Sequence, residues 1–274
     1  MASKTDSLGD RMKDFEMRMR SYVPRRSNLM IRLDGKGFSK YTKKLAKPWD
    51  LGFMHDMVST AEHLCKNIQG AKFAYVQSDE ISVLVTDYDD IATDMWFGGQ
   101  VQKVVSVTAS MAAAKFNQLR YIREMELVER RMRAALVTIG LNPDSIAAVN
   151  ECISIVSCKE PASFDSRVFV LPTAQEVVNA VIWRQNDATR NSILGLAQSM
   201  FSHRQMLNKS CAELQEMMFA NHGVNWNEVE TKYKRGVFVY CEEGDGGWRA
   251  DYEMPVITAD RDYVLRLIPD INLL

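Results

Sequence analysis

Two acidic turns contain the side chains best suited to catalysis. Asp34 lies in the segment 32–38, which reads Arg-Leu-Asp-Gly-Lys-Gly-Phe, and Asp79 lies in the segment 77–80, which reads Gln-Ser-Asp-Glu. Two carboxylates a few ångströms apart repel each other unless cations lie between them. Mg²⁺ suits such a pair, because it binds one or two carboxylates together with water and substrate phosphates. Two ions about 4 Å apart can bind the attacking and leaving oxygens of a phosphoryl displacement. The sequence therefore predicts a two-magnesium site at Asp34 and Asp79 if the turns meet.

The first turn also has the composition of a phosphate-binding loop. Glycines allow sharp turns, and successive backbone amides can surround an anion. The amides from Gly35 to Phe38, with the basic side chain of Lys36 among them, could bind a triphosphate in this way. Both turns also fit a purely structural interpretation, since Asp-Gly is a common turn and Asp-Glu is common at a solvated hairpin tip. The residues alone leave both interpretations open.

The surrounding elements decide whether the two turns meet. The predicted order is a strand at 27–33, a helix at 51–70 capped by Asp50, a hairpin with strands at 72–77 and 81–86, and a helix at 100–118. This order is that of a split βαβ, or ferredoxin-like, unit, in which the first strand and the hairpin are neighbours. We therefore predict an α/β (α+β) fold with an antiparallel sheet, helices on one face and further helical additions.

The rest of the chain supplies these additions. We expect a basic amphipathic helix within 10–26 ended at Pro24, a charged helical stretch at 119–135, a strand at 167–171, helix throughout 174–203, a helix opened by Ser210 and Glu213, a strand at 236–241, a glycine-rich turn at 244–247, and a strand or short helix after Pro255. Residues 136–162 give no clear pattern. The arginines of the charged stretch are expected to lie on a solvated helix face: Arg120, Arg123, Arg130, Arg131 and Arg133.

Composition narrows the class of protein. The 274 residues are 46% hydrophobic, and 34 basic residues balance 35 acidic ones to a net charge of −1. This balance argues against a protein that coats nucleic acid by bulk charge, but it leaves room for a local basic patch. The candidates for a phosphate-contacting patch near the N-terminus are Lys13, Arg18, Arg20, Arg25 and Arg26.

Cysteine usage and hydropathy indicate a cytoplasmic protein. The five cysteines include no C-x-x-C pair and predict reduced thiols, and the four histidines form no zinc pattern with them. The polar first ten residues predict no signal peptide, and no apolar run approaches the ~20 residues of a membrane span.

Several motifs in a fixed order resemble one enzyme family. The matching segments are 32–38 (R-x-D-G-[RK]-x-F), 75–82 (Y-x-x-S-D-E-[IYF]-S), Lys103 with Ser106 and Ser110 (K-x-x-S-x-x-x-S), 164–168 (F-D-[AGS]-R-V), 183–187 (W-R-Q-x-D) and 234–236 (K-[RK]-G). Together they resemble the tRNA-His guanylyltransferases and their guanylyltransferase-like relatives, from about residue 28 to 240.

The resemblance implies a fold like the palm of polymerases and nucleotidyl cyclases. It also implies 3′-to-5′ addition of nucleotides to the 5′ end of tRNA, after activation of that end with ATP or GTP, and two Mg²⁺ ions. Residues 1–135 would form the palm-like region with the metal and nucleotide site. Residues 136–274 would form the remainder of the same domain and a C-terminal region that contacts tRNA. The resemblance further suggests a homotetramer.

The resemblance also assigns roles by position. Asp34 and Asp79 would bind both metals, the Gly35 carbonyl would bind one of them, and Glu80 would support the site. The nucleotide phosphates would be held by Gly35, Lys36, Gly37, Phe38, Ser39 and Ser78, with Lys103 on a second triphosphate and Ser106 nearby. The candidates for tRNA contact are Arg25, Arg26, Arg167, Arg184, Arg190 and Asn191. Without the family, Lys103 reads as an exposed helix lysine. Arg167 and Arg184 fit equally well as structural ion pairs with Asp165 and Asp187.

The sequence departs from the family pattern at two places. Where eukaryotic members carry His-Ile-Asn-Asn, this chain has 188–192 (Ala-Thr-Arg-Asn-Ser), with no histidine. That stretch resembles the bacterial, archaeal and phage-type relatives, which are templated 5′-end repair polymerases with broader tRNA choice. Gln100 stands where an arginine is common.

The alternatives that remain are a nucleotidyl cyclase-like palm enzyme and a non-catalytic tRNA-binding palm domain.

Overall fold

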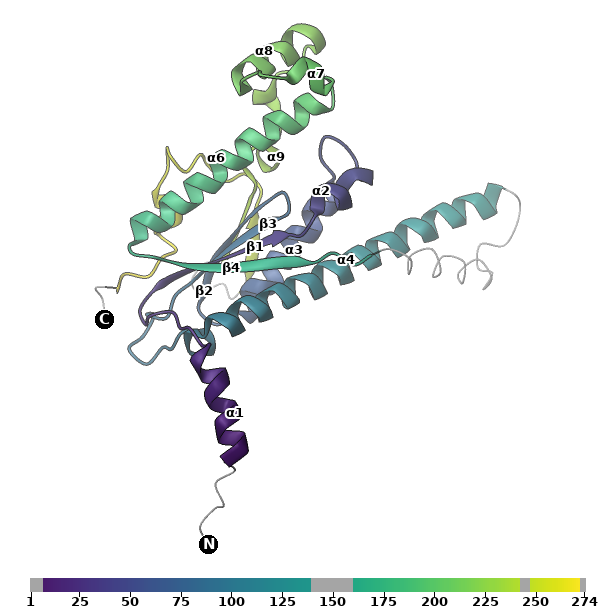
Figure 1. Cartoon of the computed structure of the whole chain (residues 1–274). Helices are drawn as coiled ribbons and strands as arrows, with labels where there is room; N and C mark the ends of the chain where they lie inside the picture. Colours follow the sequence, from purple (N-terminus) through teal and green to yellow (C-terminus); the bar gives the residue numbers. More distant parts are fainter. Residues whose placement is uncertain (1–6, 139–159, 242–246, 272–274) are drawn as a thin grey trace.

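The sheet is built from strands drawn from the whole chain. A computed structural model describes residues 7–138, 160–241 and 247–271. In these residues one antiparallel sheet has the order β4-β1-β3-β2-β5-β6 (Figure 1). Its strands are β1 (Asn28–Gly35), β2 (Ala71–Gln77), β3 (Glu80–Val85), β4 (Phe164–Leu171), β5 (Val237–Cys241) and β6 (Trp248–Asp251).

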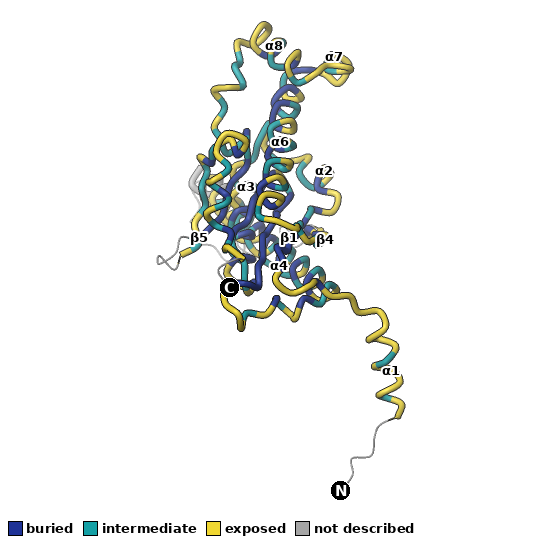
Figure 2. The backbone as a smooth tube through the Cα atoms, turned by 90° about the vertical axis from the view of Figure 1, so that its left-hand side faces the viewer, coloured by how far each residue is buried: buried dark blue, intermediate teal, exposed yellow. Residues whose placement is uncertain are grey.

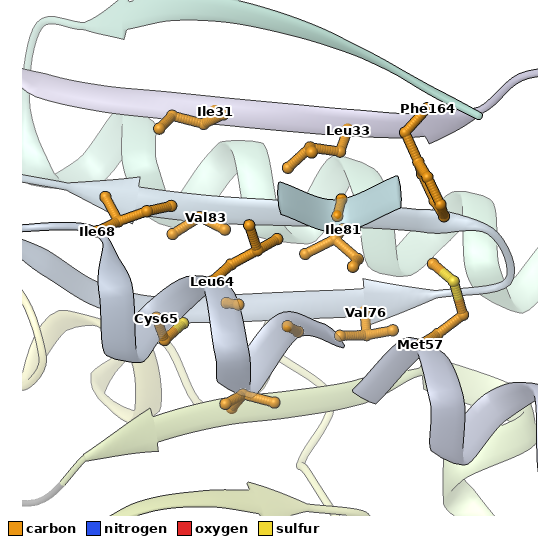
Figure 3. Packing of buried hydrophobic residues seen from close by; sticks show 14 of the residues in the cluster. Ile31, Leu33, Met57, Leu64, Cys65, Ile68, Val76, Ile81, Val83 and Phe164 are labelled. Carbon is orange, nitrogen blue, oxygen red and sulfur yellow. The ribbon is translucent and has the colours of Figure 1, made fainter. Parts of the chain in front are cut away.

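The predicted ferredoxin-like unit forms the centre of the molecule. Strands β1 to β4 alternate with α3 (Leu51–Asn67) and α4 (Val101–Thr138) in the expected order, and both helices pack on one face of the sheet. The core on this face contains Ile31 and Leu33 of β1 against Met57 and Leu64 of α3 (Figure 3). Asp50 caps α3 as predicted, since its Oδ1 accepts a 2.7 Å hydrogen bond from the Phe53 amide.

A helical addition covers the second face of the sheet. Alternate residues of a strand point to opposite faces, and Met30 and Leu84 belong to a second core with Val177 and Val181 of α6 (Ala174–Gln198). Because both faces are covered, β3 is buried along its whole length. The same core includes the C-terminal segment around α10 (Asp262–Leu265).

Helix α6 continues past the sheet into a small helical extension. This extension contains α7 (His203–Met206), α8 (Cys211–His222), η3 (Trp226–Glu228) and α9 (Thr231–Arg235), which leads into β5 (Figure 1). It has a core of its own that includes Ile193, Leu214 and Met218. The predicted capping box opens α8, with reciprocal hydrogen bonds between Ser210 and Glu213.

Some predicted boundaries were wrong. The N-terminal helix is α1 (Ser7–Arg18), which has no buried residue and projects from the body (Figure 2). The helix expected over 174–203 ends at Gln198. The short helix expected as one of two alternatives after Pro255 is confirmed as α10, whereas strand β6, which precedes Pro255, was not predicted. Strand β4 begins at Phe164, earlier than expected. The glycine-rich turn and most of 136–162 lie outside the described residues. The short helices α2 (Phe38–Tyr41), η1 (Thr42–Lys44) and η2 (Trp96–Gly99) were not predicted.

The charged stretch 119–135 continues α4, and two of its arginines correct the prediction of a solvated face. Arg120 is buried and lies 3.0 Å from Asp56 of α3, and Arg123 lies 2.7 Å from the other carboxylate oxygen. Arg130 and Arg133 are exposed, as predicted. The side chain of Arg131 lies outside the described set. No helix in the described part of the chain is long and apolar enough to cross a membrane.

Candidate active site

The pairing of β1 with β3 brings the two acidic turns together. Asp34 lies opposite Glu80 in the antiparallel register, and Asp79 occupies the tip of the β2–β3 hairpin directly before Glu80. The Gly35 amide donates a 3.1 Å hydrogen bond to the Asp79 carbonyl. Ser78 adopts a left-handed φ of 50°, which closes the tight turn. The side chains of Asp34 and Asp79 are therefore held at the same end of two central strands.

Electrostatics at this end are those of two crowded carboxylates. Burial raises the pKa of Asp79, and the negative charge of Asp34 raises it further, against a 3.1 Å hydrogen bond from the Ser78 hydroxyl. Within the described residues the Asp34 carboxylate has no hydrogen-bond or ion-pair partner, and no group of three or more His, Cys, Asp or Glu side chains could hold a metal. The site therefore offers two carboxylates and leaves other ligand positions to backbone, water and substrate. This donor set fits Mg²⁺.

Glu80 lies behind the two aspartates in a buried ion-pair network. Arg184 of α6 donates from Nε to Glu80 at 2.8 Å and from its terminal nitrogen to Asp187 at 2.7 Å. Burial raises the pKa of Glu80, although the Arg184 charge lowers it. Only 12% of the Arg184 side chain is exposed. Arg184 is thus engaged in the structural ion pair with Asp187 that the sequence left open, and it neutralises Glu80.

The other cations on this face are more accessible. Arg190 pairs with the second oxygen of Asp187, and its side chain is 63% exposed. Asn191 donates to the same carboxylate at 3.4 Å. Arg167 lies opposite Arg32 in the sheet and forms a 2.6 Å ion pair with Asp165 at the surface. Arg167 and Arg190 therefore keep the exposure that binding a polyanion requires.

The glycine turn is fixed by the phenylalanine that follows it. A Cβ at Gly35 would lie 2.3 Å from the Phe38 ring, so only glycine allows this close approach. Phe38 is buried against the rings of Phe53, Phe116 and Phe164. Gly37 has a φ of 68°, in the left-handed region that favours glycine. Residues 36, 37 and 39 remain exposed beside Asp34.

A cavity of about 250 Å³ adjoins the hairpin tip. Its walls are the loop 42–50, the strand ends at Gln77, Ser78 and Val237, and residues of α6 and α9 that include Asn191, Ser192, Lys232 and Tyr233. Sequence reasoning named Ser78 and Asn191 but missed the cavity. Its walls come from segments far apart in the chain, so no local pattern signals it.

The remaining nucleotide candidates lie elsewhere. The Thr108 hydroxyl of α4 lies 2.9 Å from the hydroxyl of Ser166, which is next to Asp34 in the sheet. Further along the same helix, the Asn117 side chain donates to the Ala162 carbonyl. Helix α4 therefore runs toward the Asp34 end of the sheet. Lys103 lies about 7 Å back along the helix from Thr108, in the direction away from Asp34. The structure does not bring Lys103 to the aspartates. The Ser106 hydroxyl donates to the Gln102 carbonyl.

Arg25 and Arg26 lie near the same end as Lys103. The Val23 amide donates to the Gly99 carbonyl at 2.8 Å, which joins this segment to the start of α4. Arg25 forms an exposed 2.9 Å ion pair with Asp94. The Arg26 amide donates to the Asp87 carboxylate at 2.9 Å. These cations therefore form a group separate from the aspartate pair.

A ferredoxin-like sheet with two aspartates at the end of its central strands, a glycine turn beside them and an adjoining cavity defines the palm class of nucleotidyltransferase. Comparison with known proteins gives the family. The family model described as tRNAHis guanylyltransferase matches residues 9–172, which is more than half of the chain. The chain belongs to the tRNA(His) guanylyltransferase family, whose members are nucleotidyltransferases.

Solved structures and sequence relatives come from the same family as the matching family model. A bacterial tRNA(His) guanylyltransferase (Thg1)-like protein is 36% identical, with TM-scores of 0.79 in its complex with ATP and 0.74 in its complex with GTP. The match to the ATP complex covers 95% of this chain and 99% of the bacterial protein. The tRNA(His) guanylyltransferase of Debaryomyces hansenii is 24% identical over 79% of this chain and 76% of its own length. The Saccharomyces cerevisiae enzyme, 19% identical with a TM-score of 0.62, supports the fold.

Proposed function

We propose that this protein adds nucleotides in the 3′-to-5′ direction to the 5′ end of tRNA. The 5′-phosphate of the tRNA first attacks the α-phosphate of ATP or GTP and displaces pyrophosphate. The 3′-hydroxyl of an incoming nucleotide, GTP or the one that a template selects, then attacks the activated 5′-phosphate and displaces AMP or GMP. The convergence of Asp34 and Asp79 at one end of β1 and β3 carries this proposal. Family membership and the nucleotide complexes of the bacterial relative support it.

The metals of this proposal would be two Mg²⁺ ions held by Asp34 and Asp79, with the Gly35 carbonyl on one of them. The observation behind this assignment is the position of the two carboxylates at one end of β1 and β3. The pKa of Asp79 is raised by burial first and by the Asp34 charge second, and cations between the carboxylates would offset both effects. When bound, such ions neutralise charge on the reacting phosphates and orient the attacking and leaving oxygens. Glu80 supports the site from its ion pair with Arg184.

The chain itself positions the nucleotides. The Lys36 side chain and the amides at 37–39 bind the phosphates beside Asp34, together with Ser78, whereas the Lys36 amide already donates to the Ser163 carbonyl at 2.9 Å. The cavity next to Ser78 accepts the base of the nucleotide. Its volume of about 250 Å³ is near the lower limit for a ligand pocket, so it suits the base alone better than a whole nucleotide. Lys103, with Ser106 nearby, binds a second triphosphate at its separate location. No protein nucleophile takes part, since a phosphate oxygen of the tRNA attacks in the first step and a nucleotide hydroxyl attacks in the second.

The tRNA contacts would come from exposed cations on two surfaces. Arg167 and Arg190 lie on the face of the aspartates, with Asn191 beside Arg190, and Arg25 and Arg26 lie at the opposite end. Arg184 contributes by orienting Asp187, which binds Arg190. The stretch 188–192 has no histidine, so we propose broader tRNA choice than tRNA-His alone, including repair of truncated 5′ ends.

We also propose a homotetramer in the cytoplasm, with residues 1–135 as the palm-like region and residues 136–274 completing the same domain and contacting tRNA. The cytoplasmic location rests on the five cysteines without a C-x-x-C pair, which predict reduced thiols. The homotetramer rests on the family resemblance.

The decisive experiment is incubation with full-length and 5′-truncated tRNAs and each triphosphate in turn, resolving the products base by base. Extension at the 5′ end by one or more nucleotides is expected. A cyclic nucleotide formed without RNA would instead identify a cyclase. Binding of tRNA with no product from any triphosphate would identify a non-catalytic tRNA-binding domain, and either result would overturn the proposal.

A further inference from the structure

The two sides of the cavity beside Ser78 are held in different ways. The α9 side is tied to the body by hydrogen bonds: the Thr189 hydroxyl donates to the Lys234 carbonyl at 3.2 Å, and the Tyr75 hydroxyl donates to the Arg235 carbonyl at 2.5 Å. Gly236, directly after α9, packs so closely on β2 that a Cβ there would lie 2.4 Å from the Val76 carbonyl. This wall is therefore fixed to α6 and β2.

The opposite wall, the loop 42–50, is tied only to itself by hydrogen bonds. Asp50 accepts from the amides of Ala46 and Phe53, and the Leu45 amide donates to the Thr42 carbonyl. All hydrogen bonds described for residues 42–50 end within residues 38–54. Among the described residues, none connects this loop to α6 or α9 across the cavity.

One aromatic pair makes the connection instead. The rings of Trp49 and Tyr233 stack with centroids 4.7 Å apart and planes 10° apart, although 184 residues separate them in the chain. Trp49 also packs against the small core of the helical extension, and both rings line the cavity. The Lys232 ammonium, paired with Glu230, lies 5.2 Å from the Tyr233 centroid and covers that ring further.

We propose that the stacked pair Trp49–Tyr233 is a latch that holds the loop 42–50 against α9 and so limits how fast a nucleotide base enters and leaves the cavity. This inference rests on the proposed function, because it takes the ligand of the cavity to be a nucleotide. Parting the rings frees the Trp49 end of the loop from α9, because no hydrogen bond across the cavity has to break, while Leu45 stays packed on the main core as the point about which the loop moves. Trp49 and Tyr233 are positioning residues in this scheme.

The test measures both binding rates with ribose-labelled fluorescent GTP and ATP in stopped flow. Trp49→Ala should raise the association and the dissociation rate constants together, by roughly three- to tenfold from the usual strength of an aromatic pair. Tyr233→Leu breaks the stack from the fixed wall and should do the same. Trp49→Phe keeps a stacking ring and should remain within about twofold of wild type. The double variant Trp49→Ala/Tyr233→Leu should be no faster than the faster single variant, since both remove one contact.

Two controls make the result decisive. Phe219→Ala removes an exposed aromatic ring from α8, away from the cavity, and should leave both rate constants unchanged. Thermal unfolding identifies a variant that fails to fold, and the other single variant that breaks the stack, Tyr233→Leu or Trp49→Ala, then carries the test.

Faster dissociation with unchanged association in the alanine variant would show that Trp49 only contacts the base, and it would overturn the latch. Unchanged rates would overturn it as well. In both cases wild-type nucleotide binding and addition leave the proposed function intact. A wild-type protein that neither binds nor adds any of the nucleotides would overturn the proposed function and the latch with it.

Discussion

Asp34 and Asp79 are two like charges that the β1–β3 register forces together. Replacing either with alanine should abolish nucleotide addition, because ions at such a site supply several kcal/mol of transition-state stabilisation, roughly a hundredfold or more in rate. Binding of tRNA should persist, since the exposed arginines are untouched. Single-turnover assays and filter binding measure the two properties. Glu129→Gln, which removes an exposed carboxylate on α4 away from the arginines proposed to contact tRNA, is the matched control. Parallel loss of activity and tRNA binding would show that the aspartates are structural.

The raised pKa of Asp79 also predicts a pH dependence of stability. Its pKa lies above the ordinary 3.8 because of burial and the Asp34 charge, so the folded protein holds that proton more tightly than the unfolded chain does. The resulting stabilisation is full below the ordinary value and is lost as pH rises through the raised one. The Asp79→Asn variant has no carboxyl group at this position, so it does not lose stability in this way as the pH rises.

Without divalent cations, the Asp79→Asn variant should therefore gain stability relative to wild type between pH 4 and pH 7. Urea unfolding in the presence of a chelator measures the difference at each pH. A difference that stays constant, or that shrinks toward neutral pH, would contradict the assigned environment of Asp79.

At the scale of elements, the contact of α3 with α4 depends on one buried carboxylate. Asp56, with 2% of its side chain exposed, binds both Arg120 and Arg123. Asp56→Ala would leave two guanidinium groups without their acceptor, one of them buried, so the free energy of unfolding should fall by roughly 3–5 kcal/mol. Glu129→Ala, which removes an exposed pair on the same helix, should cost no more than about 0.5 kcal/mol. Chemical denaturation compares them, and equal effects would contradict a special role for Asp56.

Elements with a local signal were predictable from the sequence. The hairpin tip at Ser78–Asp79, the Asp50 cap and the Ser210–Glu213 capping box each depend on neighbouring residues, and the structure contains all three. The meeting of Asp34 with Asp79 followed from the order of elements. The split βαβ pattern permits few arrangements.

What escaped prediction depends on contacts between distant segments. Arg120 and Arg123 look like any charged helix face until Asp56, more than 60 residues earlier, lies against them. The Trp49–Tyr233 stack and the cavity behind it have the same origin. Sequence periodicity reports which face of an element is buried, but not which partner buries it.

At the scale of the whole molecule, helix α1 carries an exposed apolar stripe. Helix α1 has no buried residue and exposes Leu8, Met12 and Phe15 at helical spacing, and the exposed Met19 directly follows the helix. Large apolar side chains gathered on one exposed stripe are typical of contact surfaces. This agrees with the proposed homotetramer, in which such side chains would lose their contact with water.

Sedimentation equilibrium should accordingly give a mass near four times the 31.2 kDa of one chain. The association should weaken in a variant that carries Met12→Glu and Phe15→Glu, because burying unpaired charge is unfavourable. Met17→Glu, which changes another exposed methionine of α1, controls for the added charge. A wild-type protein that sediments as a monomer would contradict the tetramer.

The cavity also has a consequence for the order in which the protein is made. A nascent chain acquires the aspartate pair once β3, which ends at Val85, has left the ribosome, but the cavity also needs α6, which begins at Ala174, and then α9 and β5. During that interval Met30, Phe73 and Leu84 have no α6 to cover them. Sheet surfaces left bare during synthesis are sites of misassociation, so this fold depends on prompt completion of its second half or on a chaperone that shields the waiting face.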